Sequence, residues 1–238
     1  MKLLSVGVDA KTVKGEKKGY LTGILYLAPA DTSGVTNVCA NATPGCKASC
    51  LFTAGRAAFI PSIIPARIRK TKYLVDDRAG FTRQLLDEID KLQAKAKRKG
   101  FKPCVRLNGT SDLPWLALNI APLFPDVIFY DYTKIQKPWL RILQNYHLTF
   151  SLSETNKQDA FDCLGAGVNV AAVFDTKHGH DLPKFWEGYK VLDGDLSDLR
   201  FLDRPFSIVG LRAKGRAKKD CTGFVQRLNA PLVQIAGT

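Results

Sequence analysis

The chain has 238 residues, 45% of them hydrophobic, so it can bury a sizeable core and is not a disordered protein. Its 35 lysines and arginines outnumber 22 aspartates and glutamates. The resulting net charge of +13 favours a polyanionic partner, with nucleic acid ahead of a nucleotide or an acidic substrate. No apolar run approaches the length of a membrane span, and the N-terminal apolar stretch is too short for a signal peptide. We therefore expect a cytoplasmic protein without a membrane partner.

The first buried strand is predicted at residues 21–28, after a polar, lysine-rich start, and Pro29 ends it. A cysteine-rich loop over residues 37–56 follows this strand. In parallel α/β sheets and barrels, ligands bind at the carboxyl ends of the strands. The loop therefore lies where a functional site is expected.

Three of the six cysteines, Cys39, Cys46 and Cys50, lie within twelve residues of this loop. Pro44 and Gly45 favour a turn that lets the three thiols face one centre. In a reducing compartment this pattern indicates metal or redox chemistry more than disulfides. Three thiolates in a compact loop suit a [4Fe–4S] cluster with one iron open or bound by a distant residue. A zinc site, which wants a fourth ligand, and three unliganded thiols are the alternatives.

Strand and helix patterns alternate through the rest of the chain. Further strands are predicted at residues 104–108, 127–130, 147–150, 168–174 and 206–211, with a short extra strand at 189–192. Helical patterns occupy residues 65–74, 81–99, 115–124, 137–144 and 157–164. This alternation implies βαβ units and mainly parallel strands. We expect one α/β domain over residues 1–238, a partial or open (β/α)6 TIM-like barrel, with a doubly wound open sheet as the alternative.

Polar side chains follow the predicted strands and should gather at one mouth, since barrel strand ends supply catalytic and ligand-holding groups. Asp131 and Glu154 are candidate general bases or ribose-binding carboxylates, and Lys134 is a candidate for holding phosphate or carboxylate groups. The candidates for cofactor binding are Asp112, Tyr130, Ser151 and Ser153.

Cys221 lies just beyond the last predicted strand. If the barrel closes, its loop comes next to the first-strand loop, and Cys221 is then a candidate fourth ligand of the cluster. A free loop thiol is the alternative interpretation.

The densest cluster of basic residues follows the predicted strand at residues 206–211. Glycines and cations in a loop can bring both backbone and side chains to phosphates, although the Gly-Lys-Ser/Thr of a Walker loop is absent. The alternative is a solvated loop. The candidate nucleic-acid-binding residues are Arg212, Lys214, Arg216, Lys218 and Lys219.

A cysteine loop after the first strand of a six-unit βα barrel resembles the architecture of the radical S-adenosylmethionine enzymes. The resemblance implies a [4Fe–4S] cluster on three cysteines, with S-adenosylmethionine bound at the open iron as a candidate cosubstrate. The spacing here is C-x6-C-x3-C, whereas that superfamily usually has C-x3-C-x2-C.

Long sequence blocks also resemble a bacteriophage family called gene product 88. This resemblance spans nearly the whole chain and implies a viral protein, located in the host cytoplasm. The blocks that carry it are residues 42–56, 105–112, 129–134, 145–151, 193–195 and 209–215.

Together these features predict a viral iron–sulfur protein that binds nucleic acid or a nucleotide through a basic surface. One alternative is a radical S-adenosylmethionine-like enzyme that uses the cluster for reductive chemistry. Another is an electron-transfer protein. The sequence leaves open whether the protein is an enzyme.

Overall fold

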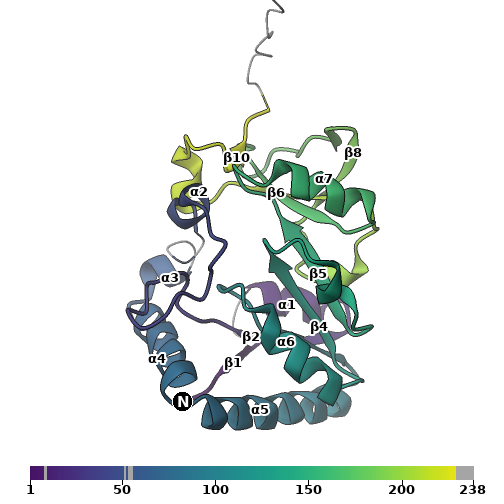
Figure 1. Ribbon diagram of the computed structural model, residues 1–238. Helices are drawn as coiled ribbons and strands as arrows, with labels where there is room; N and C mark the ends of the chain where they lie inside the picture. The colour runs from purple at the N-terminus through teal and green to yellow at the C-terminus, as the bar shows by residue number, and fades with distance from the viewer. Residues whose placement is uncertain (8–9, 51, 53–55, 229–238) are drawn as a thin grey trace, which may run out of the picture.

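The computed structural model describes residues 1–7, 10–50, 52 and 56–228. One sheet runs through the molecule, with helices around it (Figure 1). Its strands are β1 (Leu4–Val6), β2 (Tyr20–Leu25), β3 (Lys102–Arg106), β4 (Ile128–Thr133), β5 (Tyr146–Ser151), β6 (Val170–Phe174), β7 (Phe185–Trp186), β8 (Tyr189–Asp193), β9 (Ile208–Arg212) and β10 (Val225–Gln226).

Helices alternate with the central strands of this sheet. The α-helices are α1 (Ala10–Glu16), α2 (Pro44–Ala48), α3 (Arg56–Phe59), α4 (Ile63–Asp76), α5 (Arg78–Arg98), α6 (Pro114–Ile120) and α7 (Lys157–Gly165). Short 3-10 helices are η2 (Ala121–Leu123), η3 (Pro138–Arg141), η4 (Arg200–Leu202) and η5 (Gly215–Lys219).

The strand order is β1-β2-β3-β4-β5-β6-β9-β8-β7, and β10 pairs with the end of β6. All pairings from β2 to β8 along this order are parallel, whereas β1 and β7 each join antiparallel at an edge. The prediction of a mainly parallel α/β protein is therefore confirmed. Among the described residues the sheet does not close into a barrel, because its two edge strands do not pair. The order from β2 to β9 also shows no reversal of the kind that marks a doubly wound sheet.

The six main predicted strands correspond to β2, β3, β4, β5, β6 and β9, and the short extra strand corresponds to β8. Sequence patterns missed β1, β7 and β10, which are two or three residues long and too short to show periodicity. The helix predicted at residues 137–144 is wrong, because only the 3-10 turn η3 forms there. Pro138 suits the first position of a turn, and β5 begins at Tyr146, so the space allows little more than one turn.

The sheet buries side chains on both faces. On one face, Phe81 and Ile89 of α5 are fully buried in a cluster with Phe129 of β4. On the other face, Tyr130 packs with Leu199, which precedes η4. Successive residues of a strand point to opposite faces, so neighbouring β4 residues serve the two halves of the core.

The loop after β3 passes very close to the end of β2. Gly109 N–H donates to the Leu25 carbonyl at 3.0 Å. A Cβ on Gly109 would lie 2.7 Å from Ile24 Cγ2, 2.7 Å from Tyr26 Cδ1 and 2.8 Å from the Leu25 oxygen. The position therefore requires a residue without a side chain.

Gly109→Ala should lower the free energy of unfolding by about 1–3 kcal/mol, the usual cost of overpacking a tight contact. Urea denaturation monitored by circular dichroism measures the change. Gly165→Ala is the matched control, because nothing lies within 4 Å of its added Cβ, and it should be near neutral. Equal stabilities for Gly109→Ala and the wild type would contradict this account of the close approach.

Candidate functional site

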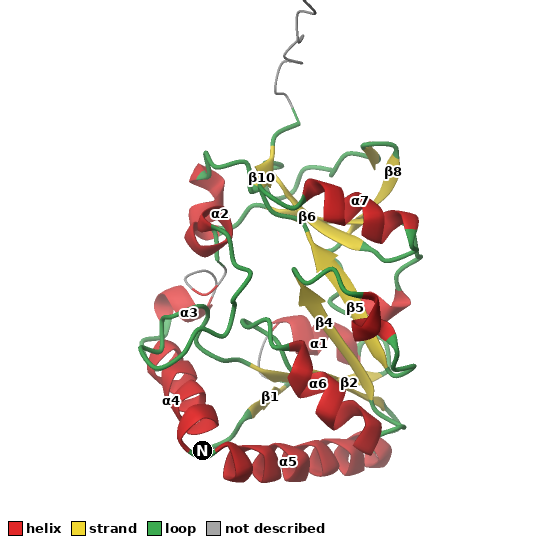
Figure 2. Ribbon diagram, in the orientation of Figure 1, coloured by secondary structure: helices red, strands yellow, loops and turns green. Residues whose placement is uncertain are grey.

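The cysteine loop lies beyond the carboxyl ends of the parallel strands. Figure 2 shows α2 and α3 on the side of the molecule toward which the arrowheads of β4 and β5 point. Cys46 is inside α2, whose first turn is capped by Thr43: its Oγ1 accepts from Cys46 N–H at 3.2 Å. Pro44 occupies the first helical position, where its missing N–H costs nothing. The predicted turn at Pro44 and Gly45 is thus one short helix that fixes Cys46.

Glu154, in the loop after β5, holds α2 in place. Its carboxylate accepts from Thr43 Oγ1 at 2.8 Å and from Gly45 N–H at 2.7 Å. A Cβ on Gly45 would lie 2.2 Å from Thr222 Oγ1 and 2.8 Å from the Glu154 carboxyl carbon. The loops after β2, β5 and β9 therefore meet at Gly45. Both carboxylate oxygens of Glu154, a candidate catalytic base, are occupied by these contacts.

The three cysteine thiols of the loop are electrostatically coupled. Burial, together with the nearby Asp112, Cys50 and Cys46, raises the pKa of Cys39 to about 11, although a backbone contact with Ala30 opposes the shift. Burial also raises the pKa of Cys50, and Cys46 adds to the shift, whereas Lys134 lowers it. All three cysteines are half-buried. The structure therefore brings them near one another without a disulfide.

Two cations lie beside Cys50. Lys134 and Arg67 both lower the pKa of its thiol. The guanidinium carbon of Arg67 lies 4.9 Å from the Tyr26 ring centroid and 5.5 Å from that of Phe52. Sequence reasoning missed Arg67, because the basic pattern of α4 gives no sign of which cation turns toward the cysteines.

Asp112 joins three segments at this site. Its N–H donates to the Val38 carbonyl at 2.8 Å, and its carboxylate accepts from Lys134 N–H at 2.9 Å. Burial raises the pKa of Asp112, and Lys134 lowers it. Next to it, Cys39 Sγ lies 3.7 Å from the Thr110 carbonyl. The structure thus places Asp112 and Lys134 at the cysteine loop.

The described residues contain no group of three or more His, Cys, Asp or Glu side chains arranged to hold one metal ion. Residues 51 and 53–55 of the predicted cysteine loop lie outside the described part of the chain. Cys221 is an exposed free thiol, next to Thr222, which touches Gly45. The predicted approach of the last-strand loop to the first-strand loop is therefore seen at Thr222, although the sheet is open.

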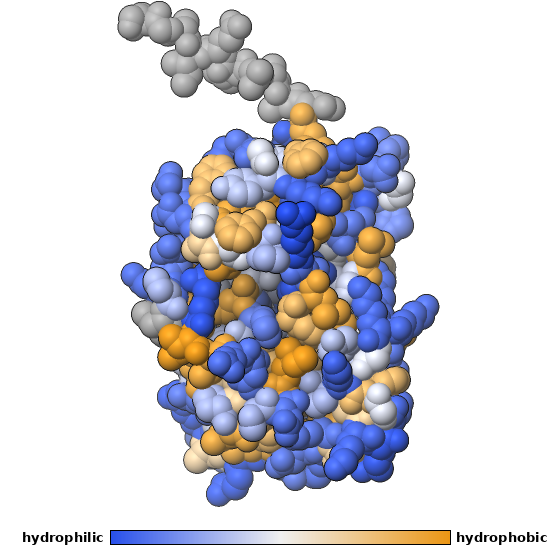
Figure 3. Space-filling view, turned by 90° about the vertical axis from the view of Figure 1, so that its right-hand side faces the viewer, coloured by the Kyte–Doolittle hydropathy of each residue, from blue (hydrophilic) through white to orange (hydrophobic). Residues whose placement is uncertain are grey.

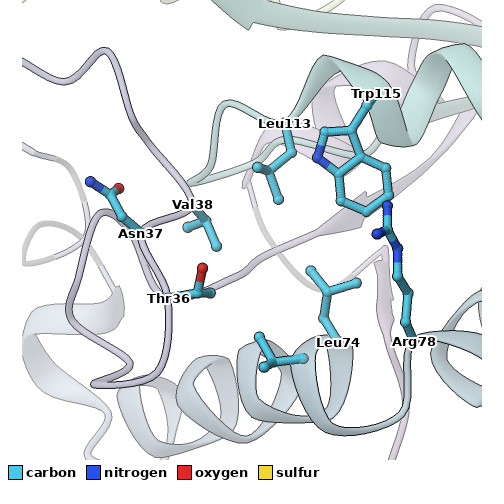
Figure 4. A pocket seen from close by; sticks show the side chains of 8 residues that line it. Thr36, Asn37, Val38, Leu74, Arg78, Leu113 and Trp115 are labelled. Carbon is cyan, nitrogen blue, oxygen red and sulfur yellow. The ribbon is translucent and has the colours of Figure 1, made fainter.

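A cavity of about 260 Å3 lies behind the cysteine loop, between Asn37 and Val38 on one side and α4 and α6 on the other (Figure 4). The Arg78 guanidinium carbon is 4.0 Å from the Trp115 ring centroid in this cavity. Such a cation–π contact contributes about 0.5–1 kcal/mol where it is exposed. The contact joins the start of α5 to α6. The Arg78 guanidinium covers one face of the Trp115 ring.

Tyr130 and Asp131 lie inside the protein and not at an open mouth. Asp131 accepts from Asn108 N–H at 2.7 Å and from Asn108 Nδ2 at 3.0 Å. Burial raises its pKa to about 7, although Arg106 opposes this shift. Tyr130 OH lies 3.4 Å from Asp198 Oδ2 on the other face of the sheet. Asp131 therefore holds the loop after β3 through Asn108, and Tyr130 contacts Asp198 in the segment before η4.

The two serine candidates lie where β5 ends. Asn156 Nδ2 donates to the Ser151 carbonyl at 3.0 Å, and Ser153 N–H donates to Asn156 Oδ1 at 2.7 Å. The buried Ser153 Oγ has no hydrogen-bond partner within the described residues. These backbone contacts shape the turn that carries Glu154 to α2.

The predicted basic cluster splits into two parts. Arg212 is paired with Asp193 at 2.9 Å and with Asp195 at 3.1 Å, and Lys214 lies 2.5 Å from Asp195. These aspartates neutralise the strand end. The remaining cations of the cluster are exposed on or beside η5 and form no ion pair within the described part of the chain: Arg216, Lys218 and Lys219.

The buried Asp131 predicts a pH dependence of folding. Its pKa is 3.8 as a free side chain and about 7 in the fold, so the folded protein holds this proton more tightly than the unfolded chain. Stability should therefore fall as the pH rises from about 4 through about 7, by up to roughly 4 kcal/mol for this group. The raised pKa values of Asp112 and Asp203 act in the same direction.

Urea denaturation at about pH 5 and about pH 8 measures this change in unfolding free energy. Asp131→Asn should flatten the dependence, whatever its absolute stability. The exposed Asp126→Asn is the matched control and should leave the slope unchanged. The lowered pKa of the half-buried His147 acts in the opposite direction in both proteins, so equal pH slopes for the wild type and Asp131→Asn would contradict the assignment.

The fold and site define an α/β protein with an open, mostly parallel sheet and a cysteine loop beyond its carboxyl edge. The chain belongs to the gene product 88 family, whose sequence model matches residues 2–227, so the predicted bacteriophage family is confirmed. No curated protein and no solved structure matches the chain. In the part of the chain that the structure describes, no helix is long and apolar enough to cross a membrane.

Proposed function

We propose that this phage protein binds a [4Fe–4S] cluster through Cys39, Cys46 and Cys50. The observation that supports the proposal is the electrostatic coupling of these three thiols in one half-buried loop, which is fixed from both sides. Thiolates are the ligands that iron–sulfur clusters use. In such a cluster each thiolate binds a different iron, so the three sulfurs need not meet at one atom.

The surroundings of the thiols suit a negatively charged cluster. Arg67 and Lys134 lie within electrostatic range of Cys50, and positive charge compensates the charge of thiolates and sulfides. Asp112 holds the loop after β4 through its bond to Lys134 N–H, and Glu154 holds α2. When bound, the cluster would supply one-electron redox chemistry. The residues of the chain position the thiols and shield them from water.

Cys221 is the proposed fourth ligand. It is exposed, and its neighbour Thr222 already touches Gly45 of the cysteine-bearing helix α2. A fourth thiolate would give a fully ligated cluster, which suits structure or electron transfer. An open fourth iron would instead suit an enzyme of the radical S-adenosylmethionine type.

The second part of the proposed function is nucleic-acid binding in the host cytoplasm. The exposed cations Arg216, Lys218 and Lys219, which form no ion pair with any residue that the structure describes, support it together with the net charge of +13. These residues lie between Ala213 and Asp220 in the loop that leads to Cys221. A phosphate backbone bound there would pass close to the cysteine site.

Anaerobically purified protein should contain about four irons and four sulfides per chain and absorb as a brown iron–sulfur protein. Cys46→Ser should lose most of this iron, because the serine hydroxyl is a poor substitute for a thiolate. Cys163→Ala, which removes a buried thiol outside the loop, is the matched control and should keep it. Iron, sulfide and absorbance measurements compare the three proteins.

A colourless protein that holds zinc or no metal would contradict the cluster. Cys221→Ser distinguishes the two forms of the proposal: loss of iron or a changed paramagnetic resonance spectrum indicates a fourth thiolate. Formation of 5′-deoxyadenosine from S-adenosylmethionine by the reduced protein would favour the enzyme alternative over a carrier.

Replacing Arg216, Lys218 and Lys219 together by glutamine should weaken binding of single- and double-stranded DNA and RNA. The negative slope of log affinity against log salt should become shallower by about 2–3, since each lost phosphate contact lowers its magnitude by about 0.7–0.9. Fluorescence anisotropy at several salt concentrations measures both effects. The exposed triple variant of Lys95, Lys97 and Arg98 removes the same charge from the end of α5 and is the matched control. Equal losses in the two variants, or no binding by the wild type, would contradict a site on η5.

A further inference from the structure

Exposed apolar side chains do not by themselves mark a binding site in this protein. On the face shown in Figure 3, hydrophobic residues lie among hydrophilic ones, and single exposed apolar side chains are common on protein surfaces. A cavity that combines apolar walls with a few convergent polar groups is a stronger indication of a ligand. Two cavities lined by described residues differ in this respect.

One cavity, of about 300 Å3, lies at the amino ends of β5 and β6, around Arg200. The charged side chains that line it are engaged within the chain. Arg200 forms a buried ion pair with Asp203 at 3.2 Å, and Arg141 Nη2 lies 3.5 Å from the Cys163 sulfur. Because these groups already have partners, the cavity gives no sign of the charge that a ligand would carry.

The cavity of about 260 Å3 behind the cysteine loop is different. Among the described residues that line it, Arg78 alone is charged. Its guanidinium carbon lies 4.0 Å from the Trp115 ring centroid, and it forms no ion pair with any residue that the structure describes. The N–H groups of a guanidinium point outward in its own plane, so stacking on a ring leaves them accessible. Arg78 is therefore a positioned cation without an anionic partner.

The carboxylates next to Arg78 along the chain do not supply that partner. Asp76 and Asp77 precede it, but neither lines the cavity. Asp77 caps α5, where its carboxylate accepts from Gly80 N–H at 2.8 Å. The cavity thus presents a positive charge and no negative one.

Two further polar groups of the lining are available to a ligand. The indole N–H of Trp115 and the hydroxyl of Thr36 form no hydrogen bond with any described residue, and neither atom is sealed from solvent. In Figure 4, Arg78 and Trp115 lie together on one side of the cavity, with Thr36 on the opposite side. The guanidinium and the indole N–H can only donate. The rest of the wall is mainly apolar: Val38, Leu74, Val75 and Leu113.

We propose that this cavity binds a carboxylate attached to an apolar group. The carboxylate would pair with the Arg78 guanidinium, which matches it in charge and geometry, and would accept from the Trp115 N–H. The apolar group would lie against Leu74 and Leu113. A phosphate dianion fits less well, because its second charge would enter an apolar cavity without a second cation. Arg78 would repel a cationic ligand.

The proposed ligand site shares a wall with the cysteine loop. Thr36, Asn37 and Val38 line the cavity, and Asn37 Oδ1 accepts from Cys39 N–H at 2.8 Å. No cysteine is among the described residues of the lining, so binding of a carboxylate there does not require an iron–sulfur cluster. The cluster and the carboxylate site can therefore be tested independently.

Nuclear magnetic resonance of the isotope-labelled, full-length protein with phenylacetate tests the proposal. The chain has three tryptophans, so the indole N–H signal of Trp115 can be assigned with a Trp115→Phe variant. Phenylacetate should shift this signal in a saturable way, with a Kd of about 1 mM, the range expected for a ligand of this size. The signal of Trp186 should not change, because Trp186 lies on β7 and packs on Phe161, outside the cavity.

Three related molecules separate the two requirements on the ligand. Phenethyl alcohol keeps the ring and loses the charge, acetate keeps the charge and loses the ring, and phenethylamine reverses the charge. Each should bind at least about tenfold more weakly than phenylacetate, since each loses either the charged hydrogen bonds or the apolar contact.

Arg78→Gln should weaken phenylacetate binding about tenfold or more and bring it close to the binding of phenethyl alcohol. Arg78 is exposed, so this variant should fold, which circular dichroism checks. Arg83→Gln is the matched control. It removes an exposed cation from the same helix outside the cavity and should bind as the wild type does.

Three results would overturn the proposal. One is the absence of a saturable Trp115 shift with phenylacetate at about 10 mM, well above the expected Kd. Another is equal binding of phenylacetate and phenethyl alcohol, or equal binding of phenylacetate by the wild type and Arg78→Gln, which would leave an apolar site without a carboxylate. The third is a response of Trp115 to a single-stranded oligonucleotide but not to phenylacetate, which would identify a base-binding site instead.

Discussion

The cysteine site depends on two hydrogen bonds between the Glu154 carboxylate and the start of α2. Because a carboxylate accepts both, these bonds are charge-assisted, a class that is stronger than hydrogen bonds between neutral groups. They join the loop after β5 to the loop after β2, and the missing side chain of Gly45 lets Thr222 approach from the loop after β9. These contacts bring the loops after β2, β5 and β9 together, although the sheet itself is open.

The charge distribution gives the two edges of the sheet different chemistry. At the carboxyl edge, burial keeps the Cys39 and Cys50 thiols protonated unless a metal replaces the proton. At the amino edge, Arg200 and Asp203 are buried as a partly satisfied pair. Only part of the excess positive charge is free to attract an anionic partner. Asp193 and Asp195 neutralise Arg212 and Lys214, whereas the cations of η5 are exposed.

The sequence predicted the parallel sheet well because apolar runs such as β4 and β6 are separated by clear turn residues and helical repeats. It also identified the cysteine loop and the gene product 88 family. It placed Asp131 at an open mouth, because a strand-end position does not reveal that Asn108 folds over the carboxylate. Arg67 was missed for a related reason: its contacts with Tyr26 and Phe52 depend on how α4 packs. The cavity around Arg200 is lined by segments far apart in the chain, so no local sequence pattern predicts it.

Iron X-ray absorption spectroscopy on the anaerobically prepared protein tests the central claim most directly. The account predicts a first shell of sulfur alone and a short iron–iron distance, both of which disappear when Cys39, Cys46 and Cys50 are replaced together by serine. A spectrum without iron–iron scattering, or iron surrounded by oxygen and nitrogen, would contradict a cluster held by these three thiolates.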